Sequence, residues 1–208
     1  MTGTIHIIDD DASVRVALQR VLSSAGYTTR CYAAAGDYLL PPPDPAPGCL
    51  LLDLQLRGFS GLDLQEALPR HPGYERPIVF LSGADDVRAS VRAMRSGARE
   101  FLTKPVDFDV LLAAVEDAIQ HDVRLRTQRR EAQEARARLA ALGQREHLVL
   151  EGIAAGRLHK QLAADLGVSE RTIKADRARI MRTLGVETLP GLLMTLRSAR
   201  ERALSHAA

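Results

Sequence analysis

The sequence lacks tryptophan, and aromatic residues make up only 4% of its 208 positions. Hydrophobic residues nevertheless amount to 46%, enough for ordinary soluble cores. Those cores must therefore be built mainly from leucine, valine, isoleucine and alanine. A chain of this length accommodates two small domains comfortably.

Cysteine is also scarce: Cys31 and Cys49 lie far apart and form no CxxC pair. This favours two reduced core thiols in a cytoplasmic protein over a disulfide or a metal site. No apolar run approaches the roughly 18 residues that a membrane-spanning helix needs. Strand-like TIHIIDDD begins almost at Met1, so we expect no secretory signal, no membrane contact and a cytoplasmic location.

The small net charge of +2 hides an asymmetry between the two halves of the chain. Residues 1–119 hold 11 Lys and Arg against 16 Asp and Glu, a net charge of −5. Residues 120–208 hold 17 against 10, a net charge of +7. An acidic half joined to a basic half suggests a regulatory module attached to a nucleic-acid binder, although a basic helix face is often only a solvated surface.

Short apolar runs alternate with helix-like segments through the first half. Strands are expected at residues 4–8, 28–32, 49–52, 78–81 and 99–102. Helices are expected at residues 12–25, 34–40, 62–68, 85–96 and 108–119. Five βα units with near-continuous apolar strands predict an α/β fold, a five-stranded parallel sheet covered by helices on both faces. The proline-rich stretch 41–48 is expected to be a surface loop.

The composition changes after residue 120. Residues 121–142 are rich in Arg, Glu, Gln and Ala, which are good helix formers with little apolar surface. A sparse heptad runs through them, so pairing in a dimer stays open, but a solvated linker helix is preferred. Residues 143–208 show helical segments and no strand pattern. We therefore predict an α/β domain at 1–120, a linker helix at 121–142 and a small all-α domain at 143–208.

Polar residues stand at the carboxyl ends of the expected strands, namely Asp9, Asp10, Asp53, Ser82 and Lys104. These ends share one edge of a parallel sheet, where open α/β folds place their sites. Three carboxylates packed together repel one another, and Mg²⁺ with oxygen ligands relieves that repulsion. A carboxylate in such a site can attack a phosphoryl group and form an acyl phosphate. Taken one at a time, these motifs also have ordinary structural interpretations. Asp11 is expected to cap a helix, and a Lys-Pro pair is ordinarily a turn.

The runs IIDDD, LLLDLQL, FLSG and FLTKP resemble, in order and spacing, the motifs of response-regulator receiver domains. That resemblance implies a doubly wound, flavodoxin-like fold. It makes Asp53 the phosphoacceptor, with Mg²⁺ bound by Asp9, Asp10, Asp53 and the Gln55 backbone carbonyl. It also implies phosphoryl contacts from Ser82 and Lys104 and a switch formed by Ser82 and Phe101. Core packing remains an equal alternative for Phe101. Arg57 replaces the usual proline and could loosen the loop, pair with Asp85 or contact the kinase. Ala84-Asp85 replaces a common His-Gly.

The stretch HKQLAADLGVSERTIKADRARIMRTLG predicts helix, short turn and helix. Ser169 is a good N-cap for the second helix, and Ile173, Ile180 and Leu184 share one stripe of it. The opposite face carries Arg171, Ala175, Ala178 and Arg182, flanked by Lys174 and Arg179. Small residues between long cations suit close approach to a DNA groove. A solvated amphipathic helix in an all-α bundle is the alternative.

The same stretch resembles the LuxR-type helix-turn-helix of FixJ/NarL response regulators, the FixJ-like branch most closely. The resemblance implies a recognition helix at 170–184. Lys174, Ala175 and Ala178 would face base edges of the DNA. Lys160, Arg171, Thr172 and Arg179 would lie nearer the DNA backbone. The helix after Thr188, which contains Leu192, Leu193 and Leu196, would supply a dimer surface. Asp176 replaces a common histidine and could meet a cytosine or pair with Arg179 or Lys160. Gly143-Gln144 replaces a Thr-Pro and gives a poorer helix start.

Together these features predict a phosphorylation-gated, DNA-binding transcription regulator rather than an enzyme. A sensor histidine kinase would phosphorylate Asp53, and a homodimer would then read two DNA half-sites. One alternative is a DNA-binding regulator that works without phosphate. Another is an Asp-nucleophile phosphotransferase, which typically needs a second carboxylate where this chain has Gln55.

Overall fold

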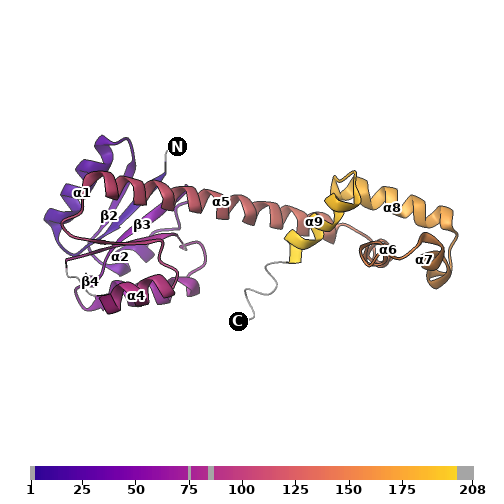
Figure 1. The fold of residues 1–208 in the computed structure, drawn as a ribbon, viewed down its shortest axis with the longest axis horizontal. Helices are drawn as coiled ribbons and strands as arrows, with labels where there is room; N and C mark the ends of the chain where they lie inside the picture. The colour runs from indigo at the N-terminus through magenta and orange to yellow at the C-terminus, as the bar shows by residue number, and fades with distance from the viewer. Residues whose placement is uncertain (1–2, 75, 84–86, 201–208) are drawn as a thin grey trace. The chain divides into compact units, whose positions relative to one another are not determined.

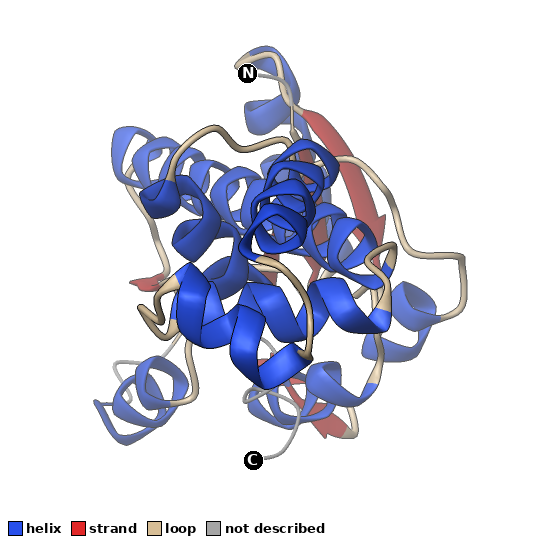
Figure 2. Ribbon diagram, turned by 90° about the vertical axis from the view of Figure 1, so that its right-hand side faces the viewer, coloured by secondary structure: helices blue, strands red, loops and turns tan. Residues whose placement is uncertain are grey.

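The computed structural model describes residues 3–74, 76–83 and 87–200. The chain divides into two compact units, residues 1–126 and 127–208, and each is described by itself (Figure 1). Within the described residues, all strands belong to the first unit and the second unit is helical. Figure 2 colours the helices blue and the strands red. No helix in this described part has both the length and the apolar character needed to cross a membrane.

The first unit is a parallel five-stranded sheet in the order β2-β1-β3-β6-β7. The strands are β1 (Thr4–Ile8), β2 (Thr28–Tyr32), β3 (Gly48–Asp53), β6 (Ile78–Ser82) and β7 (Glu100–Thr103). The helices are α1 (Ala12–Ser24), α2 (Ala35–Leu39), α3 (Gly61–Ala67), the short 3-10 helix Leu68–Arg70, α4 (Val87–Arg95) and the first part of α5 (Phe108–Ala140). This order and the helices on both faces confirm the predicted doubly wound α/β fold.

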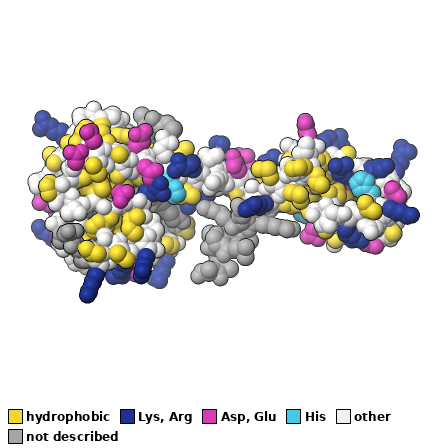
Figure 3. All heavy atoms as spheres, viewed as in Figure 1, with side chains coloured by type: hydrophobic (Ala, Val, Ile, Leu, Met, Phe, Trp, Pro, Cys, Tyr) yellow, Lys and Arg dark blue, Asp and Glu magenta, His cyan; other side chains and the backbone are white. Residues whose placement is uncertain are grey.

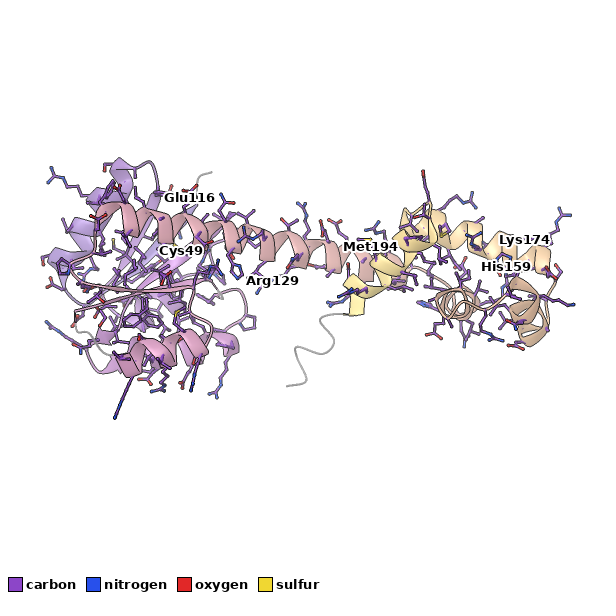
Figure 4. The ribbon with its side chains drawn as sticks, in the orientation of Figure 1. Cys49, Glu116, Arg129, His159, Lys174 and Met194 are labelled. Carbon is purple, nitrogen blue, oxygen red and sulfur yellow. The ribbon has the colours of Figure 1, made fainter. Side chains whose placement is uncertain are left out.

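The central strands supply side chains to two separate cores. In β3, Leu50 and Leu52 belong to the core with α2, α3 and α4, whereas Cys49 (labelled in Figure 4) and Leu51 belong to the core with α1 and α5. Every residue of β3 is buried. A strand buried on both faces needs apolar residues throughout, which explains the continuous run in the sequence.

The second unit contains α6 (Gln144–Ala154), α7 (His159–Leu166), α8 (Glu170–Leu184) and α9 (Leu189–Arg200). The helices α7 and α8 form the predicted helix-turn-helix. Gly167 ends α7 at φ 64°, a left-handed conformation that glycine adopts without strain. Ser169 then starts α8 by accepting a hydrogen bond from the Thr172 N–H at 3.2 Å.

The long helix α5 combines two helices that were predicted separately, at residues 108–119 and 121–142. It continues to Ala140, because neither glycine nor proline interrupts the strong helix formers of this stretch. The later part of α5 is also less solvated than expected. Ala132 and Ala135 are buried, and Arg138 donates a hydrogen bond to the Leu184 carbonyl at 2.8 Å.

A small hairpin after β3 was not predicted. It consists of β4 (Gln55–Leu56) and β5 (Phe59–Ser60), paired antiparallel. Gly58 lies between them at φ 75°, which a residue with a Cβ adopts only at a cost. Two-residue strands are too short to show an alternating pattern in a sequence.

Candidate functional site

Three carboxylates meet at the carboxyl edge of the sheet, as predicted. Asp9 follows β1 directly, Asp10 is the next residue, and Asp53 is the last residue of β3. Each of the three offers an oxygen within 4.8 Å of the others. Asp9 and Asp53 are only 2% and 7% exposed, so these charges have little access to water. Such a cluster needs positive charge to offset mutual repulsion.

Lys104 supplies part of that charge. Its ammonium nitrogen, Nζ, donates hydrogen bonds to Asp9 Oδ2 and to Asp53 Oδ1, both at 2.7 Å. Burial acts to lower the pKa of Lys104, but the bonds to Asp53 and Asp9 outweigh it and raise that pKa. Burial raises the pKa of Asp53, and Lys104 partly counteracts this. The lysine is therefore charged and holds both carboxylates in place.

The remaining oxygens are oriented by the backbone. Asp53 Oδ2 accepts a hydrogen bond from the Gln55 N–H at 3.0 Å, and Asp9 Oδ1 accepts one from the Asp11 N–H at 2.9 Å. Asp11 caps α1 by accepting from the Ser13 N–H, which confirms its predicted role. The predicted part of the Gln55 carbonyl in metal binding stays a prediction.

Arg57 occupies a position that sequence reasoning left open. Its Nε donates to Asp10 Oδ2 at 3.0 Å. The hairpin turn at Gly58 carries the chain back beside the cluster, and the first residue of α3 lies against Asp53. A Cβ on that residue, Gly61, would stand 2.3 Å from the Asp53 carbonyl oxygen. Pairing of Arg57 with Asp85 was one possibility, but Asp85 lies outside the described residues.

Ser82 and Phe101 lie near this edge on β6 and β7. Ser82 is buried, and its carbonyl accepts a hydrogen bond from the Lys104 N–H at 2.6 Å. The ring of Phe101 is half-buried, and its centroid lies 6.1 Å from that of Phe80 in the core with α4. This position agrees with core packing, and a switch role for Ser82 and Phe101 stays a prediction.

The donor set of the cluster fits a hard divalent cation. Carboxylate oxygens are the ligands that Mg²⁺ prefers, and it is usually held by one or two of them together with water. Asp9, Asp10 and Asp53 provide such oxygens at one point. Their combined charge exceeds that of Lys104 and Arg57, so a further cation would lower the electrostatic energy of the site.

The second unit presents a basic face on α8. Lys174, Ala175, Ala178, Arg171 and Arg182 are exposed, as is Lys160 on α7. Figure 3 shows Lys and Arg side chains over this unit, and Figure 4 labels Lys174 on α8. Thr172 is half-buried, and its hydroxyl lies 2.9 Å from that of the capping Ser169. Most of the predicted DNA-contacting residues therefore share an accessible face.

The expected access of Asp176 to DNA requires a correction. Asp176 is 1% exposed, and Arg145 of α6 holds it through two hydrogen bonds, from Nε to Oδ2 at 2.9 Å and from Nη2 to Oδ1 at 3.0 Å. A carboxylate in this position cannot meet a cytosine or a phosphate. Arg179 Nη2 lies 3.8 Å from Asp176 Oδ1, and its Nε lies 3.4 Å from Glu146 Oε1. Arg179 thus pairs with Asp176, one of the predicted options, and also with Glu146.

The sequence did contain a signal for this burial. Asp176 follows Ile173 by three residues and precedes Ile180 by four, which places it on the buried stripe of α8. Its partner Arg145 lies 31 positions away and raises no local pattern. Hydrogen bonding to Asp176 raises the pKa of Arg145. The pair therefore links α6 to α8 and fixes the position of the helix that bears the basic face.

Two further expectations for the second unit change. Of the three leucines predicted to form a dimer surface, Leu192 and Leu196 are buried in the core of this unit, and Leu193 is exposed. The poorer start of α6 is partly compensated, because Glu146 accepts a hydrogen bond from the Gly143 N–H at 2.9 Å.

Comparison with known proteins gives the same division into two parts. The family model "Response regulator receiver domain" matches residues 5–116, and "Bacterial regulatory proteins, luxR family" matches residues 140–196. The response regulator protein TodT of Pseudomonas putida is 35% identical over 92% of this chain and 84% of its own length. The transcriptional regulatory protein FixJ of Rhizobium meliloti is 34% identical over 91% and 93%. The solved response regulator StyR superposes with a TM-score of 0.80 at 36% identity, covering 93% of this chain and 98% of its own.

Proposed function

Because the chain belongs to the FixJ-type response regulators, with a receiver domain and a LuxR-type DNA-binding domain, we propose that phosphorylation of Asp53 by a sensor histidine kinase controls its binding to DNA. The observation that carries this proposal is the meeting of Asp9, Asp10 and Asp53 within 4.8 Å, with Lys104 bound to two of them. This arrangement gives Asp53 the surroundings that phosphoryl transfer needs.

In the proposed reaction, a carboxylate oxygen of Asp53 attacks phosphorus while the bond from phosphorus to the kinase histidine breaks. The Lys104 ammonium and the Ser82 hydroxyl contact the transferred oxygens. Asp9, Asp10, Asp53 and the Gln55 carbonyl would hold Mg²⁺, which would neutralise negative charge on the phosphoryl group. The protein promotes only its own phosphorylation and dephosphorylation, since Gln55 stands where a phosphotransferase would have a second carboxylate.

The output of the proposed switch is a dimer on DNA. Ser82 and Phe101 rearrange around the phosphoryl group, and the α4–β7 face of the receiver then allows pairing. A symmetric dimer places two copies of α8 in major grooves of half-sites about one helical turn apart. Lys174, Ala175 and Ala178 face base edges, while Lys160, Arg171, Thr172, Arg179 and Arg182 lie nearer the phosphates.

We assign the receiver to residues 1–120, the linker helix to 121–142 and the DNA-binding domain to 143–208. The linker takes up the later part of α5, the helix that joins the two family matches without a break. A regulator that meets both a kinase and the chromosome would act in the cytoplasm.

The proposal is tested by treating the full chain with Mg²⁺ and acetyl phosphate, and then measuring intact mass, oligomer size and DNA affinity. We expect a mass gain of one phosphoryl group, dimerisation and tighter DNA binding. Asp53→Asn should lose all three, whereas Asp37→Asn, at an exposed position on α2, should keep them. No mass gain in the wild type, or an unchanged gain in Asp53→Asn, would refute the proposal. A gain without a change in assembly or DNA binding would favour a regulator that works without phosphate.

A further inference from the structure

Arg57 is the charged residue of the phosphorylation loop that the proposed reaction does not use. It forms an ion pair with Asp10, a proposed metal ligand, through Nε and Oδ2 at 3.0 Å. Asp9 and Asp53 are already held by Lys104 at 2.7 Å. Each carboxylate of the cluster therefore has a cationic side chain bound to it. Arg57 is the cation on Asp10.

The guanidinium and a divalent cation would compete for Asp10. A carboxylate oxygen has room for more than one partner, but two positive charges a few ångströms apart repel each other. While paired with Arg57, Asp10 already has an oxygen within 4.8 Å of oxygens of Asp9 and Asp53. A metal bound by these three carboxylates would therefore lie close to the guanidinium, and their repulsion would weaken the pair of Arg57 with Asp10.

The surroundings of Arg57 permit its displacement. Its side chain is 88% exposed, so it can leave Asp10 without disturbing any core. On its other side it lines an open groove of about 420 Å³, whose walls include Leu39, Leu56 and Phe59. A displaced guanidinium therefore has both water and open space available. Lys104, by contrast, is only 25% exposed and is held by two carboxylates.

We propose that Arg57 is a positioning residue that holds Asp10 in the metal-free receiver and lowers its affinity for Mg²⁺, until the metal displaces it. This inference rests on the metal site of the proposed function. It gives a role to the arginine that stands where related receivers commonly have an uncharged proline. The chain would then require a higher Mg²⁺ concentration for phosphorylation than the acidic cluster alone would require.

The test is a calorimetric titration of the full chain with Mg²⁺ at low ionic strength. Arg57→Gln removes the charge and keeps most of the side chain, Arg57→Lys keeps the charge, and Asp10→Asn removes the ligand. Arg92→Gln is the matched control, because it also removes one positive charge from an ion pair. In that half-exposed pair, Arg92 of α4 lies 2.6 Å from Glu66 of α3. This control separates a local effect from the change in net charge.

We expect Arg57→Gln to bind Mg²⁺ about two- to five-fold more tightly than the wild type, which is the range that an exposed ion pair supports. Arg57→Lys and Arg92→Gln should lie closer to the wild type, and added salt should reduce the difference. If Arg57→Gln binds Mg²⁺ equally or less tightly, or if Arg92→Gln tightens binding as much, the inference is wrong while the metal site stands. If the wild type binds no Mg²⁺, the metal site of the proposed function fails and the inference fails with it.

Discussion

Replacing Arg145 with alanine should destabilise the second unit more than replacing Asp176 with asparagine, although both substitutions break the same ion pair. The reason is the unequal burial of the partners. The side chain of Arg145 is 50% exposed, whereas that of Asp176 is 1% exposed. Without Asp176, the guanidinium can turn into water. Without Arg145, the Asp176 carboxylate stays buried. Its remaining ion-pair partner in the described residues is Arg179, whose Nη2 lies 3.8 Å from Asp176 Oδ1.

The expected magnitudes follow from this asymmetry. Removing one partner of a fully buried pair costs about 3–5 kcal/mol, because the other charge is left unpaired. Partial exposure of Arg145 and the nearby Arg179 reduce this, so we expect about 2–3 kcal/mol for Arg145→Ala. Asp176→Asn keeps the volume and leaves an amide that can still accept a hydrogen bond, so about 1 kcal/mol is expected. The double variant should be more stable than the sum of the two losses predicts.

Urea unfolding followed by far-ultraviolet circular dichroism measures these differences on the full chain. With a slope of about 1 kcal/mol per molar urea, Arg145→Ala should lower the midpoint of the second unit by about 2–3 M. Arg171→Ala, which removes an exposed arginine of α8, is the control and should shift it little. If Asp176→Asn loses as much stability as Arg145→Ala, or more, the reasoning is wrong, because the buried carboxylate would then not depend on Arg145.

Two more predictions concern the two units separately. Burial and the nearby Arg76 lower the pKa of His6 to about 4, so between pH 6.5 and about 4 the unfolded chain binds a proton that the folded protein does not. The free energy of unfolding of the first unit should therefore fall by up to about 3 kcal/mol as the pH falls through this window. When unfolding is measured across this pH range, the fall should be smaller in His6→Gln. An equal dependence of stability on pH in the two proteins would contradict the prediction. Lys174→Ala should weaken binding to a specific DNA site by about 1–3 kcal/mol, which fluorescence anisotropy measures. An unchanged affinity would show that Lys174 is not part of the recognition surface.

The fold of the first unit could be predicted because its signals are local. A strand buried on both faces shows as a continuous apolar run, and β3 is such a strand. Once five parallel strands are expected, topology alone brings their carboxyl ends to one edge. That is why Asp9, Asp53 and Lys104 could be placed together before any distance was known.

The parts that could not be predicted depend on partners distant in sequence or on missing signals. The continuity of α5 and the burial of Ala132 and Ala135 in its later part are two such features, because the sequence of this stretch shows only strong helix formers with little apolar surface. The pairing of Arg57 with Asp10 joins residues 47 positions apart, and no local pattern specifies it. Leu192 lies on a helix whose sequence alone does not distinguish a core face from a dimer face.

The pairs Arg57–Asp10 and Arg145–Asp176 show how burial decides what a charged substitution does. Both place an arginine on an aspartate at about 3 Å. Arg57–Asp10 is exposed, so it contributes little to stability, and its proposed effect arises because Asp10 is a metal ligand. Arg145–Asp176 encloses its carboxylate, so it supports the fold and leaves Asp176 no access to DNA. The distance alone would not have separated these roles, whereas the exposure of the carboxylate does.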